Sequence, residues 1–488
     1  MERLSREDSS RKAFMFYQGS VRLCQRFRIV SNAFLQAPGL PFADVLDEAK
    51  IREAFDAEGA WFAQDDNDVY TPALVLWAFL SQVLHADHLR SCSAAVSRVI
   101  VLCVALGRRP PSEDTGAYCR ARARLSEAVL RRLTYDAAEE LEQRVPADWR
   151  WCGHRVYLGD GTTLSAPDTP QNQAAWPQPS AQKPGLGFPL LRMVVLLSLA
   201  TAALRGMELG PYSGKETGET ALLRKMLGCL DSGDVFLGDC YFCSYFMIAL
   251  LMAENKHAVL RQHQCRKTDF QLGQRLGTGD HMVVWQRPEC PTWMDEATYQ
   301  TIPATLSIRE IEVCVETPGF RANRIIVVTT LTNAQRYTKE ELARLFRLRW
   351  HIELDLRNIK ITMHMDDLRG KTPDMVRKEI WMHWLAYNLI RKSMAQAALL
   401  HAKPPRQLGF AGALQAIVAA WDHATVAAPA TLLELAHVQL RFMSLQKIGH
   451  RPDRVEPRAI KRRPKPHKLL TKPRKEARAE LLGGAATE

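Results

Sequence analysis

The chain lacks the long apolar run that a membrane-spanning helix requires. Its most apolar stretch, LLRMVVLLSLATAALRGMEL, is interrupted by Arg192 and Arg205 and stays below the roughly 18 uninterrupted apolar residues of such a helix. We therefore expect this stretch to form two core strands. The first residues, MERLSREDSSRKAF, are too charged for a secretory signal, so we expect a cytoplasmic protein.

The chain also lacks cysteine pairs at the spacing of a zinc site or a disulfide framework. Its eleven cysteines are odd in number, scattered and mostly set in apolar runs, which indicates reduced core residues. Cys240 and Cys243 form a C-x-x-C motif, but no second pair accompanies it. We interpret this pair as packing at a strand-to-helix turn, with a redox or zinc site as the less favoured alternative.

The chain has fewer acidic residues than basic ones, with 53 Asp and Glu against 65 Lys and Arg. The formal net charge is +12 and the isoelectric point is about 9.2, which favours a polyanionic partner such as DNA. Residues 451–478, with Arg462 and Arg463 at their centre, hold twelve Lys or Arg against three Asp or Glu, a net charge of +9. This proline-interrupted segment has little to bury, so we expect an extended tail that rests on nucleic acid or on a neighbouring subunit's acidic surface. A solubilising disordered terminus is the alternative.

The segment FRLRWHIELDLRNIK, residues 346–360, is typical of a helix with two different faces. At about 100° per residue, Arg349, Glu353 and Lys360 share one face, with Phe346 beside them, while leucine and isoleucine line another. One acid between two cations suits a metal ion and the phosphate that the metal activates. A surface helix with an i, i+4 Arg–Glu pair is the simpler alternative.

Two further acids follow short apolar runs. Asp160 ends RVYLGD and Asp239 ends DVFLGD, so we expect each to close a strand at the carboxyl edge of a sheet. Either one alone is more simply explained as the cap of a turn. Together with Glu353 they form an all-carboxylate set without His or Cys, which suits a small, hard cation such as Mg²⁺.

These acids resemble the catalytic residues of a known family. Asp160 in LGDGTTL, Asp239 in LGDCYF and Glu353 are similar to the Asp-Asp-Glu triad of DDE transposases. The spacing of Arg349, Glu353 and Lys360 is similar to the Tyr-(2)-Arg-(3)-Glu-(6)-Lys signature of insertion sequence family four.

The resemblance extends to the segments around these acids. Residues 165–178 and 368–391 are also similar to the family, so the resemblance covers roughly residues 110–475. One position departs from the pattern, because Phe346 stands where the family has Tyr and lacks the hydroxyl that could donate to a phosphate or a base.

The resemblance implies an enzyme that binds the ends of an insertion sequence, cleaves the strands and transfers the 3′ ends to target DNA. Two Mg²⁺ ions, which Mn²⁺ can replace, would be held with Asp160 bridging both, Asp239 on one and Glu353 on the other. Arg349 and Lys360 would clamp phosphates beside the scissile bond. The implied partners are double-stranded DNA, as terminal inverted repeats and as target, and a second subunit in the DNA complex.

Two other classes of protein remain open. One is a catalytically inactive, domesticated DNA-binding protein, which Phe346 favours weakly and the intact triad disfavours. The other is a metal-dependent nuclease of unrelated function on the same fold, which the basic tail and the family-like flanking segments disfavour.

The patterns predict an α/β fold with a β-rich region between the second Asp and the Glu and helical regions at both ends. The resemblance implies that the core is ribonuclease-H-like and that the β-rich region is an insertion. In chain order the expected parts are a helical N-terminal domain that is a candidate for binding DNA ends (1–145), the first part of the core (150–256), the β insertion (257–335), the second part of the core with the Glu helix (336–400), a helical region (401–450) and the basic tail (451–488). The resemblance implies that the insertion separates the fourth and fifth core strands. We expect an irregular loop near the site at residues 165–187.

Further DNA contacts are candidates in three places, and the first is the ring of Phe346 beside Arg349 and Lys360. Arg120 and Arg122 lie on an expected helix that could face terminal-repeat DNA or solvent equally well. Trp285 and Trp293 in the insertion are candidates for stacking on an unpaired base. For both tryptophans we favour the alternative, in which they fill the core of the insertion.

Overall fold

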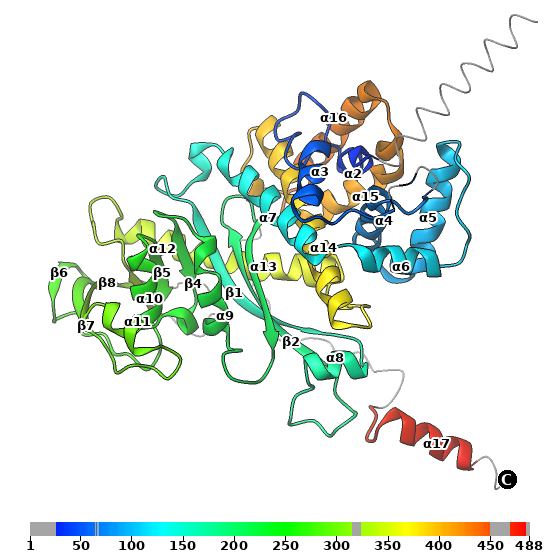
Figure 1. Ribbon diagram of the computed structural model, residues 1–488. Coiled ribbons are helices and arrows are strands. Elements are labelled where there is room, and N and C mark those ends of the chain that lie inside the picture. The colour runs from blue at the N-terminus through cyan, green and yellow to red at the C-terminus, as the bar shows by residue number, and fades with distance from the viewer. Residues whose placement is uncertain (1–25, 64, 66–67, 315–323, 449–468, 485–488) are drawn as a thin grey trace, which may run out of the picture.

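The computed structural model describes residues 26–63, 65, 68–314, 324–448 and 469–484 (Figure 1). A mixed sheet of nine strands occupies one part of the molecule, and helices from both ends of the chain gather beside it. The protein is therefore a mixed α/β protein with a large sheet. No helix in the described residues is long and apolar enough to cross a membrane.

The sheet has the strand order β3-β2-β1-β4-β5-β9-β8-β7-β6. The pairs β1–β4 and β4–β5 are parallel, and all other neighbours are antiparallel. The strands are β1 (Val156–Ser165), β2 (Leu190–Ser198), β3 (Leu204–Pro211), β4 (Val235–Gly238), β5 (His257–Arg261), β6 (Gln274–Gly277), β7 (Asp280–Gln286), β8 (Thr305–Cys314) and β9 (Arg324–Thr329). The apolar stretch interrupted by Arg192 and Arg205 forms β2 and β3, which confirms the prediction of two core strands.

The strand-rich region does not separate the fourth and fifth strands of the sheet, so that prediction is wrong. Residues 257–261 form β5, which pairs in parallel with β4, and β9 then pairs with the free edge of β5. The run Ala258–Leu260 is fully buried, as expected of a central strand rather than part of an added hairpin. Strands β6 to β9 thus follow the fifth strand and continue the same sheet.

Helices cover both faces of the sheet. On one face, side chains of β1 and β4 pack into a core shared with α13 (His351–Arg357) and α14 (Pro373–Leu400). On the other face, they pack with α9 (Glu219–Lys225) and α10 (Tyr245–Ala253). The loop expected at 165–187 contains a short helix, α8 (Pro170–Ala175), which Thr169 begins by capping the amide of Asn172.

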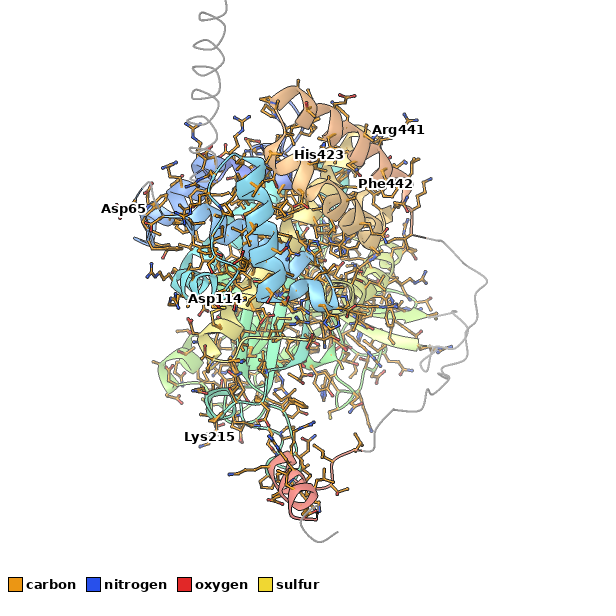
Figure 2. All side chains as sticks on the ribbon, turned by 90° about the vertical axis from the view of Figure 1, so that its right-hand side faces the viewer. Asp65, Asp114, Lys215, His423, Arg441 and Phe442 are labelled. Atoms are coloured by element: carbon orange, nitrogen blue, oxygen red, sulfur yellow. The ribbon has the colours of Figure 1, made fainter. Side chains whose placement is uncertain are left out.

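The N-terminal and C-terminal helices lie side by side although they are far apart in the sequence (Figure 1). Trp77 of α4 donates to the hydroxyl of Thr425 in α15 at 2.9 Å and stacks on Trp421. These helices are α2 (Arg28–Ala33), α3 (Glu48–Ala57), α4 (Pro72–Leu84), α5 (Cys92–Ala105), α6 (Gly116–Arg124), α7 (Glu127–Gln143), α15 (Phe410–Val426) and α16 (Pro429–Leu445). Figure 2 shows Arg441 and Phe442 of α16 at one end of the molecule and Lys215, between β3 and α9, toward the other.

The long helix α14 buries polar side chains in this helical part. Lys392 is fully buried, and its Nζ has no hydrogen-bond partner among the residues that the structure describes. The amide of Gln396, one turn later, is buried and unpaired in the same described set. Because burial penalises the charged form, the pKa of Lys392 falls to about 7.

We expect Lys392→Met to stabilise the protein by about 1–3 kcal/mol at pH 7, since it removes an unpaired buried amine. Between the ordinary value of 10.5 and the folded-state pKa of about 7, the unfolded chain binds a proton that the folded chain does not. The free energy of unfolding of the unsubstituted protein therefore falls as the pH drops from 10.5 to about 7. The advantage of the variant should be largest at pH 7 and below, and should shrink toward pH 10.5.

Urea midpoints across this pH range measure the effect. Lys378→Met is the matched control on the same helix, because Lys378 Nζ is bonded to Asp374 and to the carbonyl of Ala123. A pH-independent difference for Lys392→Met would contradict the explanation by burial.

Candidate active site

The register of the parallel strands places Asp160 and Asp239 beyond the same end of one strand pairing. β1 pairs with β4 through Val156–Val235 to Leu158–Leu237. Asp160 lies two residues after the last pair on the side of β1, and Asp239 lies two residues after it on the side of β4. The two acids that the sequence singled out thus follow the same end of this pairing.

Only one of these acids stands at the end of a strand. Asp239 directly follows β4 and caps the short turn Cys240–Phe242, where its side chain accepts from the Cys240 amide. Asp160 is the fifth residue of the ten-residue β1, so the prediction that it closes a strand is wrong. β1 runs on because β2 pairs with it as far as Ser165, whereas β4 stops earlier.

Glu353 lies on a helical segment that packs on β1. Helix α12 (Lys339–Arg347), a 3₁₀ turn η5 (Leu348–Trp350), α13 and a π turn η6 (Asn358–Thr362) follow one another without a break. Ile352 and Leu356 of α13 share the core with Leu158 of β1. Side chains alternate along a strand, so Asp160 points to the same face as Leu158, toward the helix that carries Glu353.

Charges of both signs surround Asp160. Burial raises the pKa of Asp160 to about 6, the Gly161 amide and the Arg349 charge oppose this rise, and the charges of Glu219 and Glu353 add to it. Arg349 in turn pairs with Glu353, with Nη2 and Oε1 3.2 Å apart. Arg349 and Glu353 thus share one face, as expected, and that face lies near Asp160.

The carboxylates bond to their own neighbours in this arrangement. Asp160 Oδ1 accepts from the Gly161 amide at 2.8 Å, and Glu353 accepts from Arg349. Across the described residues, no three His, Cys, Asp or Glu side chains stand close enough to hold a metal ion as they are oriented. The donor set nevertheless suits a hard cation, since all its members are carboxylates, and rotation of the side chains is what binding would require.

Lys360 is tied to the strand of Asp160. Its Nζ donates to Thr162 Oγ1 and to the carbonyl of Thr163, each at 2.9 Å. Burial lowers the pKa of Lys360. A lysine ammonium has three donors, so one remains for a phosphate. The sequence suggested a phosphate clamp only, and the bond between the π turn η6 and β1 was not foreseen.

A buried ion-pair network fixes the other side of α13. Asp355 is 1% exposed and accepts from Arg391 of α14 and from Arg406, each at 2.6 Å. Arg406 also donates to the carbonyls of Ser198 and Leu199 at the end of β2. Glu353 is therefore carried by a helix that is bonded to both the sheet and α14.

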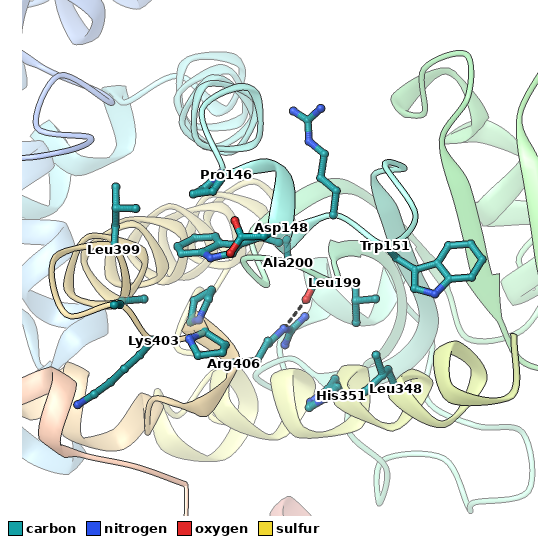
Figure 3. A pocket seen from close by; sticks show the side chains of 16 residues that line it. Pro146, Asp148, Trp151, Leu199, Ala200, Leu348, His351, Leu399, Lys403 and Arg406 are labelled. Atoms are coloured by element: carbon teal, nitrogen blue, oxygen red, sulfur yellow. Dashed lines mark hydrogen bonds between the residues drawn. The ribbon is translucent and has the colours of Figure 1, made fainter. Parts of the chain in front are cut away.

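A cavity of about 770 Å³ lies beside this network (Figure 3). His351, Leu399 and Arg406 line it, and none of the three acids is among its lining residues in the described chain. Figure 3 shows the bond from Arg406 to the carbonyl of Leu199 within it. The cavity is thus separate from the acids.

Two aromatic residues proposed as DNA contacts are buried. Trp285 is 3% exposed, donates to Glu310 at 2.8 Å and is covered by the guanidinium of Arg266 at 3.7 Å. Phe346 is 7% exposed and packs in the main core. Neither ring presents a face to DNA, so the structure does not support either residue as a DNA contact. The burial of Trp285 fits the alternative that this residue fills the core of the insertion.

The arginines of the N-terminal domain divide into two kinds. Arg120 is exposed on α6, as a DNA contact requires. Arg122 instead points inward, where it bonds to Gln82 at 3.1 Å and lies over the ring of Phe79. The structure therefore does not support Arg122 as a DNA contact. Arg462 and Arg463 lie outside the described residues.

Comparisons with known proteins identify the family of the chain. The family model described as "Transposase DDE domain" matches residues 151–389, which include all three acids. The chain is also 29% identical, over 75% of its length and 80% of the relative, to the transposase InsG for insertion sequence element IS4 of Escherichia coli (strain K12). The chain belongs to the DDE transposases.

Shorter and weaker likenesses accompany these matches. The transposase for insertion sequence element IS421 of Escherichia coli is 35% identical over 18% of this transposase and 23% of its own length. The piggyBac transposase in a synaptic complex with hairpin DNA has a TM-score of 0.40 and 8% identity, covering 88% of this chain and 85% of its own. The structural likeness is too low to bear on the assignment.

We expect Lys360→Met to loosen β1 of this transposase. The change keeps the apolar stem but removes both hydrogen bonds to Thr162 and Thr163, each worth about 1.5–3 kcal/mol for a charged donor. Amide hydrogen exchange of residues 160–165 in the free protein should accelerate by at least about tenfold.

Lys339→Met is the control, because Lys339 lies on α12 of the same helical segment and bonds to the carbonyl of Thr278 instead. Unchanged exchange in β1 would show that Lys360 serves DNA alone.

Proposed function

We propose that this transposase binds the ends of an insertion sequence, cleaves the strands there and transfers the 3′ ends to target DNA. The observation that carries the proposal is the register of β1 and β4, in which Asp160 and Asp239 both lie two residues beyond the last pair, next to the core that β1 shares with the Glu353 helix. The three carboxylates of this DDE transposase would then serve one site.

Asp160, Asp239 and Glu353 would hold two Mg²⁺ ions, with Mn²⁺ able to replace them. When bound, such ions activate a water or a 3′-hydroxyl and stabilise the leaving oxygen of a phosphodiester. Arg349 would orient a phosphate beside the scissile bond through its planar, bidentate guanidinium. To bind the phosphate, Arg349 would have to break its ion pair with Glu353.

The core that presents these acids is proposed to be ribonuclease-H-like. The order β3-β2-β1-β4-β5, with β1, β4 and β5 parallel and β2 and β3 antiparallel, supports this fold. Strands β6 to β9 would then be an extension of its sheet at the β5 edge.

The proposed partner is double-stranded DNA, as terminal inverted repeats and as target. A net charge of +12 supports a polyanionic ligand, and Arg120 is an exposed candidate contact. We further propose a dimer in the complex with two ends, and a cytoplasmic location. The described cysteines are all free, as in a reducing compartment.

We expect Asp160→Asn, Asp239→Asn and Glu353→Gln each to abolish Mg²⁺-dependent cleavage of a terminal-repeat duplex. Each change removes a charged ligand, while affinity for the duplex should stay nearly unchanged because it rests mostly on Lys and Arg. Gel-based cleavage and binding assays on the same preparations measure both.

Glu340→Gln serves as the control, since Glu340 is an exposed acid at the start of the same helical segment. Near-normal cutting by any of the three variants would remove that residue from the assignment.

Deletion of residues 451–488 tests the basic tail. If the tail lies on DNA, the truncated protein should bind a single end more weakly at low salt, and the slope of log K against log salt should fall by roughly 0.9 for each lost phosphate contact. If the tail docks on a second subunit, single-end binding should stay normal and pairing of two ends should fail. An unchanged slope with normal pairing would leave a solubilising tail as the explanation.

A further inference from the structure

A fourth carboxylate, that of Glu219, lies beside Asp160. Glu219 is the first residue of α9, on the face of the sheet opposite α13. A Cβ built on Gly161 would stand 2.4 Å from Cδ and 2.5 Å from Oε1 of Glu219. The Glu219 carboxylate thus lies against the backbone of β1 one residue beyond Asp160.

The absence of a side chain at Gly161 is what allows this approach. Any other residue there would meet the carboxylate of Glu219 at far less than van der Waals distance. The pairing of β1 with β4 ends at Leu158, so the next residues of β1 have no strand neighbour on the side of Asp239. Glu219 lies against Gly161 from the α9 face, while Glu353 is carried by the helix that covers the α13 face.

The start of α9 is held in place from two directions. Thr220 Oγ1 donates to the carbonyl of Tyr241 at 3.1 Å, in the turn that follows Asp239. Arg192 of β2 donates to the carbonyl of Thr217 at 2.8 Å, just before α9. Glu219 is therefore positioned by bonds to the segment of Asp239 and to the strand next to Asp160.

Glu219 has no cationic partner of its own. Within the described part of the chain it forms neither an ion pair nor a side-chain hydrogen bond, whereas Glu216, three residues earlier, pairs with Arg224. An unpaired carboxylate held close to a second one is unfavourable unless a cation neutralises both. Of the cations near Asp160 in that part of the chain, Arg349 already pairs with Glu353 and Lys360 is bonded to Thr162 and Thr163.

We propose that Glu219 is a fourth carboxylate of the divalent-cation site, acting on the ion beside Asp160 from the face opposite Glu353. This inference rests on the proposed function, since it requires Asp160 to hold that ion. Its role is to add negative charge where Asp160, Asp239 and Glu353 leave the α9 side of the ion uncovered.

The test is the affinity of the full-length protein for Mn²⁺, measured without DNA by the loss of the free-ion electron paramagnetic resonance signal. Glu219→Gln keeps the shape and removes the charge, so we expect the affinity to fall by about tenfold or more. The Mg²⁺ concentration for half-maximal cleavage should rise by a similar factor.

Three comparisons separate the possible failures. Glu216→Gln removes a carboxylate from the same loop that already has a partner, and should leave Mn²⁺ affinity unchanged. Asp160→Asn should abolish both Mn²⁺ binding at this site and cleavage. If Asp160→Asn still cleaves DNA, the proposed function fails. If Asp160→Asn loses both while Glu219→Gln matches the parent in Mn²⁺ affinity, the role of Glu219 alone is overturned.

Glu219→Asp and Gly161→Ala guard against misfolding of the glutamine variant. Aspartate keeps the charge but shortens its reach by one methylene, so affinity between those of the parent and Glu219→Gln is expected. Alanine at position 161 displaces the Glu219 carboxylate by contact and should weaken Mn²⁺ binding. Parent-like affinity in both folded variants would overturn the inference.

Discussion

Three pairs of residues in parallel strands, from Val156–Val235 to Leu158–Leu237, set the position of Asp160 relative to Asp239. Because side chains alternate along a strand, a slip of one residue in this pairing would turn Asp160 away from the helix of Glu353. The pairing is held by burial on both faces, since Leu158 and Leu237 pack in one core and Tyr157 and Phe236 in the other. Apolar packing thus positions polar groups that contribute nothing to the core.

The third acid depends on a different kind of constraint. Glu353 is half-exposed, but the helix that carries it is bonded on its buried side through Asp355 to two arginines. A buried ion pair of this sort adds little net stability compared with apolar packing, yet losing one partner is costly. Its value here is orientation: it sets the rotation of the helix and therefore the side on which Arg349 and Glu353 stand.

Local patterns in the sequence predicted the helix that carries Glu353 and the two strands β2 and β3, because each is encoded by neighbours within a few residues. The position of the insertion was not predictable in this way. Strand pairing between β5 and β9 joins residues about seventy positions apart. The composition of 257–261 is equally typical of a core strand and of a strand in the insertion. The inward turn of Arg122 depends on its bond to Gln82, which no local pattern indicates, whereas the burial of Trp285 agrees with the alternative that the sequence analysis favoured. No sequence pattern indicated a role for Glu219, since only the folded chain brings it to Gly161.

The continuity of the sheet has a mechanical consequence. β5 is hydrogen-bonded on one edge to β4, which leads into Asp239, and on the other edge to β9 of the added strands. No flexible linker between separate sheets intervenes in this part of the described chain, so a pull on β6 to β9 is borne by backbone ladders rather than by a hinge. A load that DNA places on those strands would bend or twist the sheet, and the strain would arrive at the gap between Asp160 and Asp239.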